Sequence, residues 1–309
     1  MKQRSNPLIV ISGTTASGKS SLALRLAVRF HGEIVSADSR QCYKYLDIGT
    51  SKPSLDERRE IPHHLIDFLD LDKVYSAGRF LHDARRIMDE ITGRGNVPFL
   101  VGGTGFYIKS ALYGLPELPP VSESIVNNLK VELKTKGNSL LYAELLSRDP
   151  EYAKKIAPTD HFRLLHSLSV IRASNKPFSS FKTEDKINRQ YLHINLDPPR
   201  EILKESIAKR TRDMLRAGWV SEVKSLLDKG FDPLSIGFQT LGYKEIIDSL
   251  LGKISLDEAE NRIVILTNQF AKRQQTFFRN QFENGIDLRL EKPDLDYLTT
   301  VLRGYLLMI

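Results

Sequence analysis

The sequence is poor in cysteine and has no long apolar run. Cys42 is the single cysteine among 309 residues, which excludes an internal disulfide framework and a zinc site built from several cysteines. The apolar run nearest the N-terminus is "LIVI", shorter than the core of a signal peptide and far shorter than the roughly 20 residues that cross a bilayer. We therefore expect a cytoplasmic protein, in a reducing compartment and without a membrane anchor.

The charge of the chain is positive. Lys and Arg number 45 against 38 Asp and Glu, which gives a formal net charge of +7 and a pI near 9.3. A basic surface favours attraction to nucleic acid or to phosphate-rich ligands. Charge alone does not choose between these partners.

Buried strands and amphipathic helices alternate along the first part of the chain. The segments "PLIVI", "GEIVSADS" and "VPFLVGGTG" each begin as an apolar strand, and the last two run into a polar or glycine-rich turn. Residues 76–95 have apolar positions at helical spacing, with Ser76 as a candidate N-cap and a glycine at the end. This alternation predicts an α/β fold with a parallel sheet, and ligands in such folds bind at the carboxyl ends of the strands.

A glycine-rich loop connects the first strand to the first helix. It matches the P-loop pattern G-x-x-x-x-G-K-[ST] in the strand, loop, helix context that the pattern requires. The glycines let backbone N–H groups close around phosphate oxygens, and the lysine and the helix N-terminus supply positive charge. Ser20 is the expected Mg²⁺ ligand. The residues expected to bind a diphosphate or nucleotide are Gly13, Thr14, Thr15, Ala16, Ser17, Gly18, Lys19 and Ser20.

The pattern changes after the proline-rich segment "GLPELPP". Residues from about 121 to 180 hold helical patterns without a convincing strand, "RQYLHINLDPP" reads as a returning strand, and amphipathic helices dominate beyond residue 200. We expect a P-loop NTPase-like parallel sheet core with an inserted helical subdomain. The first part of the core covers residues 1–115, the insertion residues 116–189, and the return strand and C-terminal helices residues 190–309.

Two further strand ends carry polar side chains. Asp38 follows one strand and Thr104 follows another, so both are expected at the carboxyl edge of the sheet, beside the P-loop. Asp38 could hold magnesium through water, or it could accept a proton from an incoming nucleophile as a general base. The spacing alone does not separate these two roles.

Eight sequence blocks occur in register between residues 9 and 279. They are "GTTASGKS", "DSRQCYKYLDIGTSKP", "IPHHLID", "YSAGRF", "VPFLVGGTGFYIKSALYGL", "RDMLRAGWVSEV", "LGYKE" and "AKRQQTFFR". In this order the chain resembles the bacterial tRNA dimethylallyltransferases, the tRNA isopentenyltransferases of the IPP transferase family. The resemblance implies transfer of a prenyl group from dimethylallyl diphosphate to N6 of the adenosine 3′ of the anticodon, position 37 of tRNA. The P-loop would then hold the diphosphate, with Mg²⁺.

The resemblance also implies roles for individual residues. Asp38 matches the general base on the adenine amino group, Thr104 the hydroxyl that helps to hold that group, and Arg210 the arginine that reaches the diphosphate. The neighbouring Arg212 is the competing choice for this arginine. The residues expected to contact tRNA, at its anticodon stem-loop, are Asp38, Ser39, Arg40, Gln41, Thr104, Arg163, His166, Lys272 and Arg273. Phe277, Phe278, Trp219 and Tyr243 are expected to pack in the core.

The chain departs from the family pattern in "DHFRLLHSLSVIR", where Phe162, His166 and Ser169 replace the usual residues. The departures bear on RNA affinity or substrate choice more than on the chemistry. Three alternative functions stay open at this point. One is an isopentenyltransferase acting on free AMP, ADP or ATP, and another, which the P-loop by itself would support, is a small-molecule kinase that binds ATP. The third is a non-catalytic RNA-binding role. We expect a monomer.

Overall fold

The computed structural model describes residues 6–183, 186–282, 286–288 and 294–309. The chain forms two compact units, one made of Met1–Leu112 with Ile187–Ile309 and the other of Tyr113–Lys186. The second unit is thus an insertion in the first, with its ends at residues 113 and 186 where the sequence suggested 116 and 189. The backbone N–H of Ile187 donates to the carbonyl of Leu112 at 2.9 Å, so the chain closes on itself where the insertion leaves and returns.

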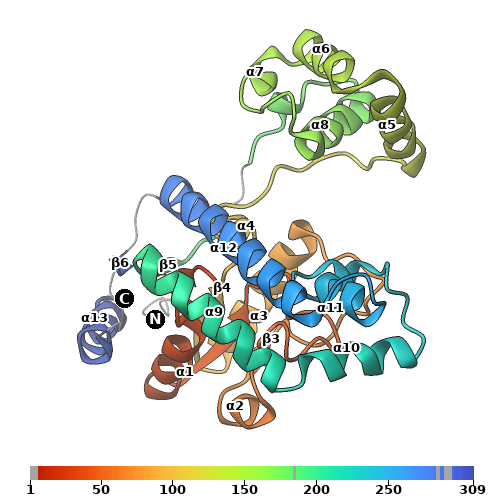
Figure 1. Cartoon of the computed structure of the whole chain (residues 1–309). Coiled ribbons are helices and arrows are strands. Elements are labelled where there is room, and N and C mark those ends of the chain that lie inside the picture. Colours follow the sequence, from red (N-terminus) through yellow and green to blue (C-terminus); the bar gives the residue numbers. More distant parts are fainter. Residues whose placement is uncertain (1–5, 184–185, 283–285, 289–293) are drawn as a thin grey trace. The chain divides into compact units, whose positions relative to one another are not determined.

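A parallel β-sheet forms the centre of the larger unit (Figure 1). The described residues give six strands in the order β3-β2-β4-β1-β5-β6, and every pairing is parallel. The strands are β1 (Pro7–Gly13), β2 (Gly32–Ser36), β3 (His63–His64), β4 (Val97–Gly102), β5 (Gln190–Leu196) and β6 (Ile286–Leu288). The expected α/β fold with a parallel sheet is confirmed, although β3 and β6 are too short to be read from periodicity.

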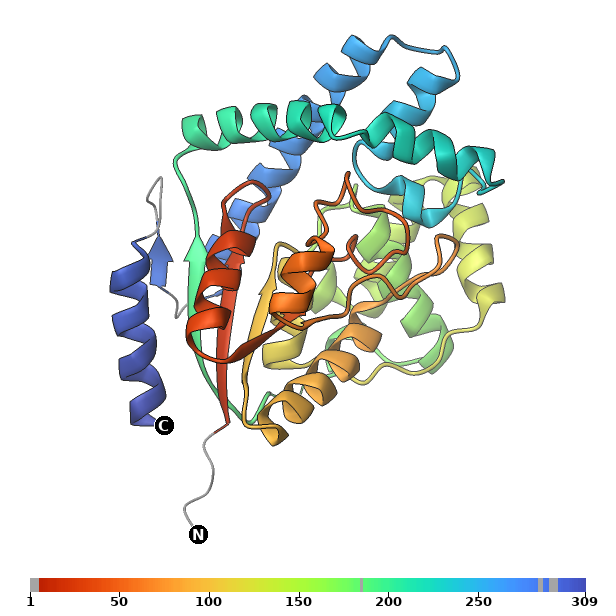
Figure 2. The same ribbon diagram turned by 90° about the horizontal axis from the view of Figure 1, so that it is seen from below.

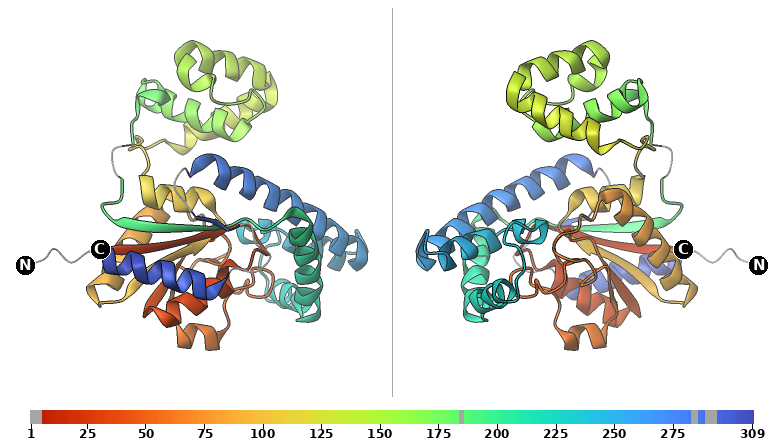
Figure 3. Two further views of the ribbon diagram at one scale, coloured as in Figure 1. Left: turned by 90° about the vertical axis from the view of Figure 1, so that its left-hand side faces the viewer. Right: turned by 90° about the vertical axis from the view of Figure 1, so that its right-hand side faces the viewer.

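Helices cover both faces of this sheet, which explains why its strands are continuous apolar runs. Helix α1 (Lys19–Arg29) and helix α13 (Leu295–Met308) pack on one face, where their leucines and alanines meet Ile9 and Ile11 of β1. Figure 3 shows α12 (Leu256–Gln281) on the opposite face. The remaining helices of the sheet region are α2 (Leu55–Glu60), α3 (Ala77–Gly93) and α4 (Gly105–Tyr113).

The helices between residues 200 and 250 lie beyond the carboxyl ends of the strands (Figure 2). Figure 2 shows α9 (Arg200–Arg216) crossing this edge of the sheet, above the loop between β1 and α1. Helix α9 also packs against α12. They are accompanied by α10 (Trp219–Asp228), the 3₁₀ turn η2 (Ile236–Gln239) and α11 (Tyr243–Leu250). The sheet edge is therefore walled by helices that come from the second half of the chain.

The expected core aromatics of this region are buried. Trp219 is 1% exposed, Tyr243 is 0% exposed, and their rings meet edge to face at 5.5 Å. Phe278 is also buried, and Phe277 packs against Gly105, where a Cβ would come within 2.4 Å of its ring. These four residues thus pack as expected.

The described residues of the inserted unit form helices and connecting loops, without a strand. The unit has its own core, built from leucines and isoleucines of several helices, among them Leu129, Leu145 and Leu168. Arg172 pairs with both Glu132 and Glu144 and joins three helices. The elements are α5 (Glu123–Lys136), α6 (Asn138–Arg148), α7 (Pro150–Ala153), α8 (His161–Ser174) and the 3₁₀ turn η1 (Phe178–Ser180). In the part of the chain that the structure describes, no helix is both long and apolar enough to cross a membrane.

Candidate active site

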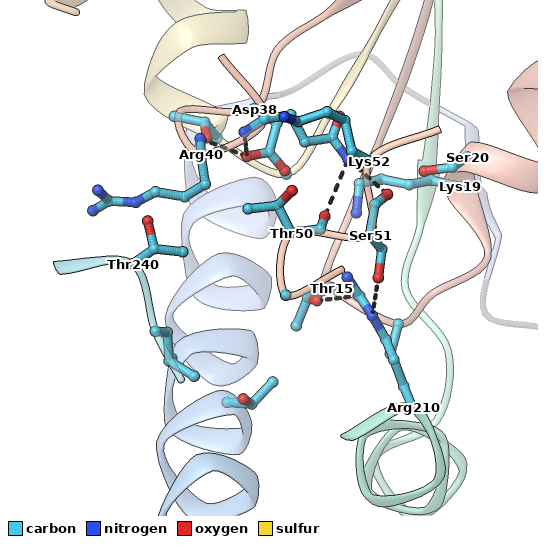
Figure 4. Close-up of a pocket in the computed structure, with 18 of the residues that line it drawn as sticks. Thr15, Lys19, Ser20, Asp38, Arg40, Thr50, Ser51, Lys52, Arg210 and Thr240 are labelled. Atoms are coloured by element: carbon cyan, nitrogen blue, oxygen red, sulfur yellow. Dashed lines mark hydrogen bonds between the residues drawn. The ribbon is translucent and has the colours of Figure 1, made fainter. Parts of the chain in front are cut away.

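A cavity of about 920 Å³ opens at the carboxyl edge of the sheet in the larger unit. The P-loop, the ends of β2 and β4, the segment 49–53 and helices α9 and α12 line it. Figure 4 shows the side chains that these elements direct toward one another. The strand ends predicted to carry the chemistry therefore meet in one place, as the parallel sheet requires.

The P-loop backbone depends on two glycines. Gly18 has φ of 85°, a left-handed conformation that glycine adopts without steric cost, and it directly precedes the first turn of α1. A Cβ on Gly13 would lie 2.7 Å from the carbonyl oxygen of Leu196 and 2.9 Å from Ser17 Oγ. Helix α1 therefore begins at the loop with its N-terminal N–H groups directed toward the cavity.

The hydroxyls of the P-loop are suited to an anion. Among the described residues, the buried Thr14 Oγ1 and Ser17 Oγ have no hydrogen-bond partner within the protein. A buried hydroxyl without a partner is unfavourable, and phosphate oxygens accept hydrogen bonds. Neither residue is part of the cavity wall, so the groups of the loop that face the cavity are those of Thr15, Ala16, Gly18, Lys19 and Ser20.

Lys19 lies in the cavity with its charge partly compensated. Its Nζ donates to the carbonyl of Thr14 at 3.0 Å. Burial lowers the pKa of Lys19 to about 8, while the negative charge of Asp38 acts in the opposite direction and the positive charge of Arg210 adds to the lowering. An anionic ligand in this cavity would favour the protonated form of Lys19.

Asp38 and Thr104 lie on neighbouring strand ends, and both side chains line the cavity. Asp38 Oδ1 accepts the N–H groups of Arg40 at 2.8 Å and Gln41 at 3.3 Å, which fixes the carboxylate. Thr104 Oγ1 accepts the N–H of Ser39 at 3.0 Å, so the two turns are hydrogen-bonded to each other. The structure brings together the two residues that the sequence assigned to the acceptor amine.

The structure also separates the two candidate arginines of α9. Arg210 points into the cavity, where Nη1 donates to Thr15 Oγ1 at 2.6 Å and Nε donates to Ser51 Oγ at 3.1 Å (Figure 4). Burial lowers the pKa of Arg210, and the charge of Asp38 opposes this shift. Arg212 is exposed. Of the two arginines, Arg210 is the one placed to reach an anion on the P-loop.

Gln41 lines the cavity but its amide is engaged within the protein. Oε1 accepts from Ser36 Oγ at 3.1 Å, and Nε2 donates to the carbonyls of Thr50 at 3.2 Å and Ser51 at 3.1 Å. An adenine that paired with this amide would have to replace these bonds. In this structure Gln41 joins the turn after β2 to residues 50–51, and its contact with an acceptor base stays a prediction.

Of the other residues in the larger unit that are expected to contact RNA, some line the cavity and one does not. Ser39, Arg40 and Arg273 line the cavity, and the guanidinium of Arg273 lies 6.0 Å from the centre of the Phe270 ring. Lys272 is exposed on α12 and is not part of the cavity wall. Their proposed contacts with RNA stay predictions.

Arg163 and His166 lie on α8 of the inserted unit. Both are exposed, and Arg163 forms an ion pair with Asp160 at 3.5 Å. The His166 ring is nearly parallel to that of Phe162 and meets the edge of Phe178, and desolvation beside these rings lowers the pKa of His166. The neutral imidazole therefore predominates at pH 7, and in that form a contact with phosphate is a hydrogen bond without charge.

Sequence reasoning missed two residues that hold the site. Gln274 of α12 accepts the N–H of Thr15 at 2.9 Å and donates to the carbonyl of Gly103 at 2.8 Å. Gln274 lies within the block "AKRQQTFFR", but only the basic and aromatic residues of that block suggest a role from the sequence. A glutamine inside a long helix gives no local signal for a contact with two loops more than a hundred residues away.

Lys52 is the second residue that was missed. Its side chain is 1% exposed, and Nζ contacts the carboxylates of Asp47 and Asp67 and the carbonyl of Tyr43. A buried ammonium with three oxygen partners holds its loop in one conformation. That loop carries Ser51, the partner of Arg210.

Known proteins similar in sequence to this chain belong to the family that its sequence blocks resemble. The family model described as IPP transferase matches residues 41–281, and the one described as isopentenyl transferase matches residues 6–73. A tRNA dimethylallyltransferase of Microcystis aeruginosa is 46% identical over 274 residues, which are 88% of this chain and 84% of that protein. The tRNA dimethylallyltransferase 2 of Geotalea uraniireducens is 42% identical over 279 residues, 89% of this chain and 90% of that protein.

Solved structures agree with these relatives. The tRNA isopentenylpyrophosphate transferase of Staphylococcus epidermidis is 37% identical with a TM-score of 0.70, and the match covers 97% of this chain and 98% of that one. A eukaryotic dimethylallyltransferase described as acting on tRNA is 28% identical with a TM-score of 0.77, covering 96% of this chain and 77% of that one. The P-loop, the paired strand ends and these matches agree, and the chain belongs to the IPP transferase family.

Proposed function

We propose that this enzyme transfers the dimethylallyl group of dimethylallyl diphosphate to N6 of the adenosine 3′ of the anticodon, position 37 of tRNA. The observation that carries the proposal is the placement of Asp38 and Thr104 in the same cavity as Lys19 and Arg210. A carboxylate that can accept a proton thus faces a set of cations and P-loop groups that can hold a diphosphate.

The reaction exchanges one bond for another. The bond between the allylic carbon and the diphosphate oxygen breaks, its electron pair leaves with the diphosphate, and a bond forms between that carbon and N6 of adenine. The N6 proton passes to Asp38, because the amine lone pair is delocalised into the ring and gains nucleophilicity as the proton departs. In this proposal Thr104 orients the amino group, and the N–H of Ser39 holds its hydroxyl beside Asp38.

The leaving group gains negative charge as its bond breaks. In this proposal Lys19, Arg210 and the N–H groups at the start of α1 stabilise this developing charge, since Lys19 and Arg210 line the same cavity as the P-loop. The P-loop residues that line the cavity beside Lys19 are Thr15, Ala16, Gly18 and Ser20. The P-loop in this proposal holds a diphosphate that departs whole, and no phosphoryl group is transferred.

We also propose that the reaction uses Mg²⁺. The donors present are hard oxygens, the Ser20 hydroxyl and the Asp38 carboxylate, which line the cavity together with room for substrate oxygens. Mg²⁺ prefers such oxygens and is commonly held by a few protein groups together with phosphates and waters. When bound, the ion neutralises charge on the diphosphate. In the described residues no cluster of three or more His, Cys, Asp or Glu forms a separate metal site.

The proposed setting is a monomer in the cytoplasm. Every side chain assigned to diphosphate binding and proton transfer comes from one unit of a single chain, so no second copy is needed for chemistry. The single cysteine, Cys42, is buried as a free thiol, which suits a reducing compartment.

A labelled-substrate assay tests the proposed reaction. The full chain is incubated with Mg²⁺, labelled dimethylallyl diphosphate and an anticodon stem-loop that carries adenosine 3′ of the anticodon, and a stem-loop with guanosine at that position is the matched control. Label in the adenosine stem-loop alone supports the proposal. Label in free AMP or ATP, offered in parallel, would assign the enzyme to free adenylates instead, and transfer of phosphate from ATP would identify a kinase.

A further inference from the structure

Gln274 connects two loops that the reaction must hold at a fixed separation. It lies on α12 with 8% of its surface exposed. Its Oε1 accepts the backbone N–H of Thr15 in the P-loop at 2.9 Å, and its Nε2 donates to the carbonyl of Gly103 at 2.8 Å. Thr15 belongs to the loop that holds the diphosphate, and Gly103 directly precedes Thr104.

The contact between Gln274 and the second loop is close. A Cβ at Gly103 would lie 2.5 Å from Gln274 Nε2, 3.3 Å from the carbonyl oxygen of Gly13 and 3.5 Å from Lys19 Nζ. Gly103 is therefore enclosed between the P-loop and α12. No side chain at position 103 is compatible with this packing, so the amide of Gln274 can lie directly against the backbone.

The hydrogen-bonding pattern of the glutamine is fully determined. Thr15 offers a donor and Gly103 an acceptor, so the side chain between them must supply one acceptor and one donor. A neutral amide does so, and an ionised carboxylate of the same shape does not. The P-loop N–H of Thr15 is thereby satisfied by α12, leaving the other groups of the loop for the diphosphate.

We propose that Gln274 is a positioning residue that fixes the separation between the P-loop and the turn of residues 103–104. The inference rests on the proposed function, because this separation sets the alignment of the allylic carbon on the diphosphate with the acceptor amine held by Thr104 and Asp38. A misplacement of about 1 Å between reacting groups can reduce a rate on the order of 10²-fold. Gln274 acts through these loops, and its role requires no contact with the reacting atoms.

The first test uses two variants of the full chain, Gln274→Leu and Gln274→Glu, with Gln275→Leu as the matched control. Gln275 is the next residue of α12 and donates to Asp197, which keeps its ion pair with Arg279 when the glutamine is replaced. For Gln274→Leu we expect kcat on the stem-loop to fall about tenfold to a hundredfold, with the dissociation constant of inorganic diphosphate changed less than about threefold. The Gln275→Leu variant should retain kcat within about twofold.

The pH dependence of Gln274→Glu separates positioning from simple loss of packing. A protonated carboxyl supplies the same donor and acceptor as the amide, whereas the ionised form places negative charge against the carbonyl of Gly103. The ratio of variant to wild-type kcat should therefore rise as the pH falls from 8.5 to 5.5. A ratio that stays flat with pH, together with normal kcat in Gln274→Leu, would overturn the proposal. So would equal losses of diphosphate binding and kcat in Gln274→Leu.

Amide exchange gives a readout that does not need turnover. The N–H of Thr15 should exchange with solvent at least about tenfold faster in Gln274→Leu than in wild type, because it loses its acceptor. An unchanged exchange rate of the Thr15 N–H would contradict the proposed role of Gln274, even if the variant enzyme were active. If the wild-type enzyme failed to prenylate the stem-loop, the proposed function would fail while the exchange result still decided whether Gln274 joins the two loops.

Discussion

Arg210 and Thr15 are 195 positions apart in the sequence, and Arg210 Nη1 lies 2.6 Å from Thr15 Oγ1. This bond connects α9 to the P-loop, and Ser51 accepts a second bond from the same guanidinium. A half-buried cation at this place needs anionic or polar partners, and a diphosphate on the P-loop would supply them. The second half of the chain thus contributes directly to a site that begins with residue 13.

Replacing Arg210 should weaken transition-state stabilisation. We expect Arg210→Gln to lower kcat/KM on the order of 10²-fold, since the variant loses one cation and its fixed donors at the leaving group. The matched control is Arg212→Gln on the exposed side of the same helix, which should stay within about twofold of wild type. Steady-state kinetics with dimethylallyl diphosphate and the stem-loop measures both. Equal losses in the two variants would contradict the assignment of Arg210.

Replacing Asp38 should remove proton transfer while leaving the diphosphate in place. Asp38→Asn keeps an oxygen that can accept the N–H groups of Arg40 and Gln41, so the turn is retained and only the charge is lost. We expect kcat to fall by roughly 10² to 10⁴-fold. Calorimetric titration with inorganic diphosphate in the absence of Mg²⁺ should show an affinity at least equal to that of wild type, because a negative charge has been removed from the cavity. A variant with normal turnover would show that Asp38 is not the base.

Diphosphate affinity should depend on the protonation of Lys19. Burial lowers the pKa of Lys19 to about 8, so the free enzyme carries this charge below pH 8 and loses it above. Binding of the anion raises the pKa again, and the affinity should therefore fall by up to about tenfold per pH unit above pH 8. Lys19→Arg stays protonated throughout. The ratio of the wild-type to the variant dissociation constant cancels titration of the ligand, and it should rise from pH 8 to pH 10.

The close packing of Gly49 against Trp219 can be tested by measuring the free energy of unfolding. A Cβ at Gly49 would lie 2.1 Å from Trp219 Nε1, in a part of the wall that is already filled. We expect Gly49→Ala to lower the free energy of unfolding by about 3 kcal/mol in urea titrations. Gly93→Ala is the control, because nothing lies within 4 Å of its Cβ position. In a Trp219→Leu background the cost of Gly49→Ala should largely disappear, and an undiminished cost would locate the strain elsewhere.

Much of the architecture was predictable because its signals are local. Buried strands such as β1 and the P-loop pattern are each contained in fewer than 15 residues, and parallel pairing then brings Asp38 and Thr104 to one edge. The short strands β3 and β6 carry no periodicity of their own and depend on their neighbours. The proline cluster suggested the first boundary of the insertion and the returning strand the second, at 116 and 189 where the inserted unit has 113 and 186.

The parts of the site that were missed depend on contacts that leave no local pattern in the sequence. Gln274 and Lys52 are ordinary polar residues in sequence, and their roles arise only when α12 and the loop of residues 47–53 reach their partners. The choice between Arg210 and Arg212 was open for a similar reason. Two residues along a helix point in different directions, and the sequence does not say which direction faces the P-loop.

The hydrogen bond at the base of the insertion, between Leu112 and Ile187, has an evolutionary consequence. Leu112 and Ile187 are joined by a backbone hydrogen bond, and the two ends of the inserted unit are therefore adjacent in space. A helical segment of different length or surface could be exchanged there without shifting β5, α4 or any strand end that lines the cavity. Selection can thus reshape the insertion separately from the catalytic apparatus, and a chimera that carries a relative's insertion between these two residues should inherit an intact cavity.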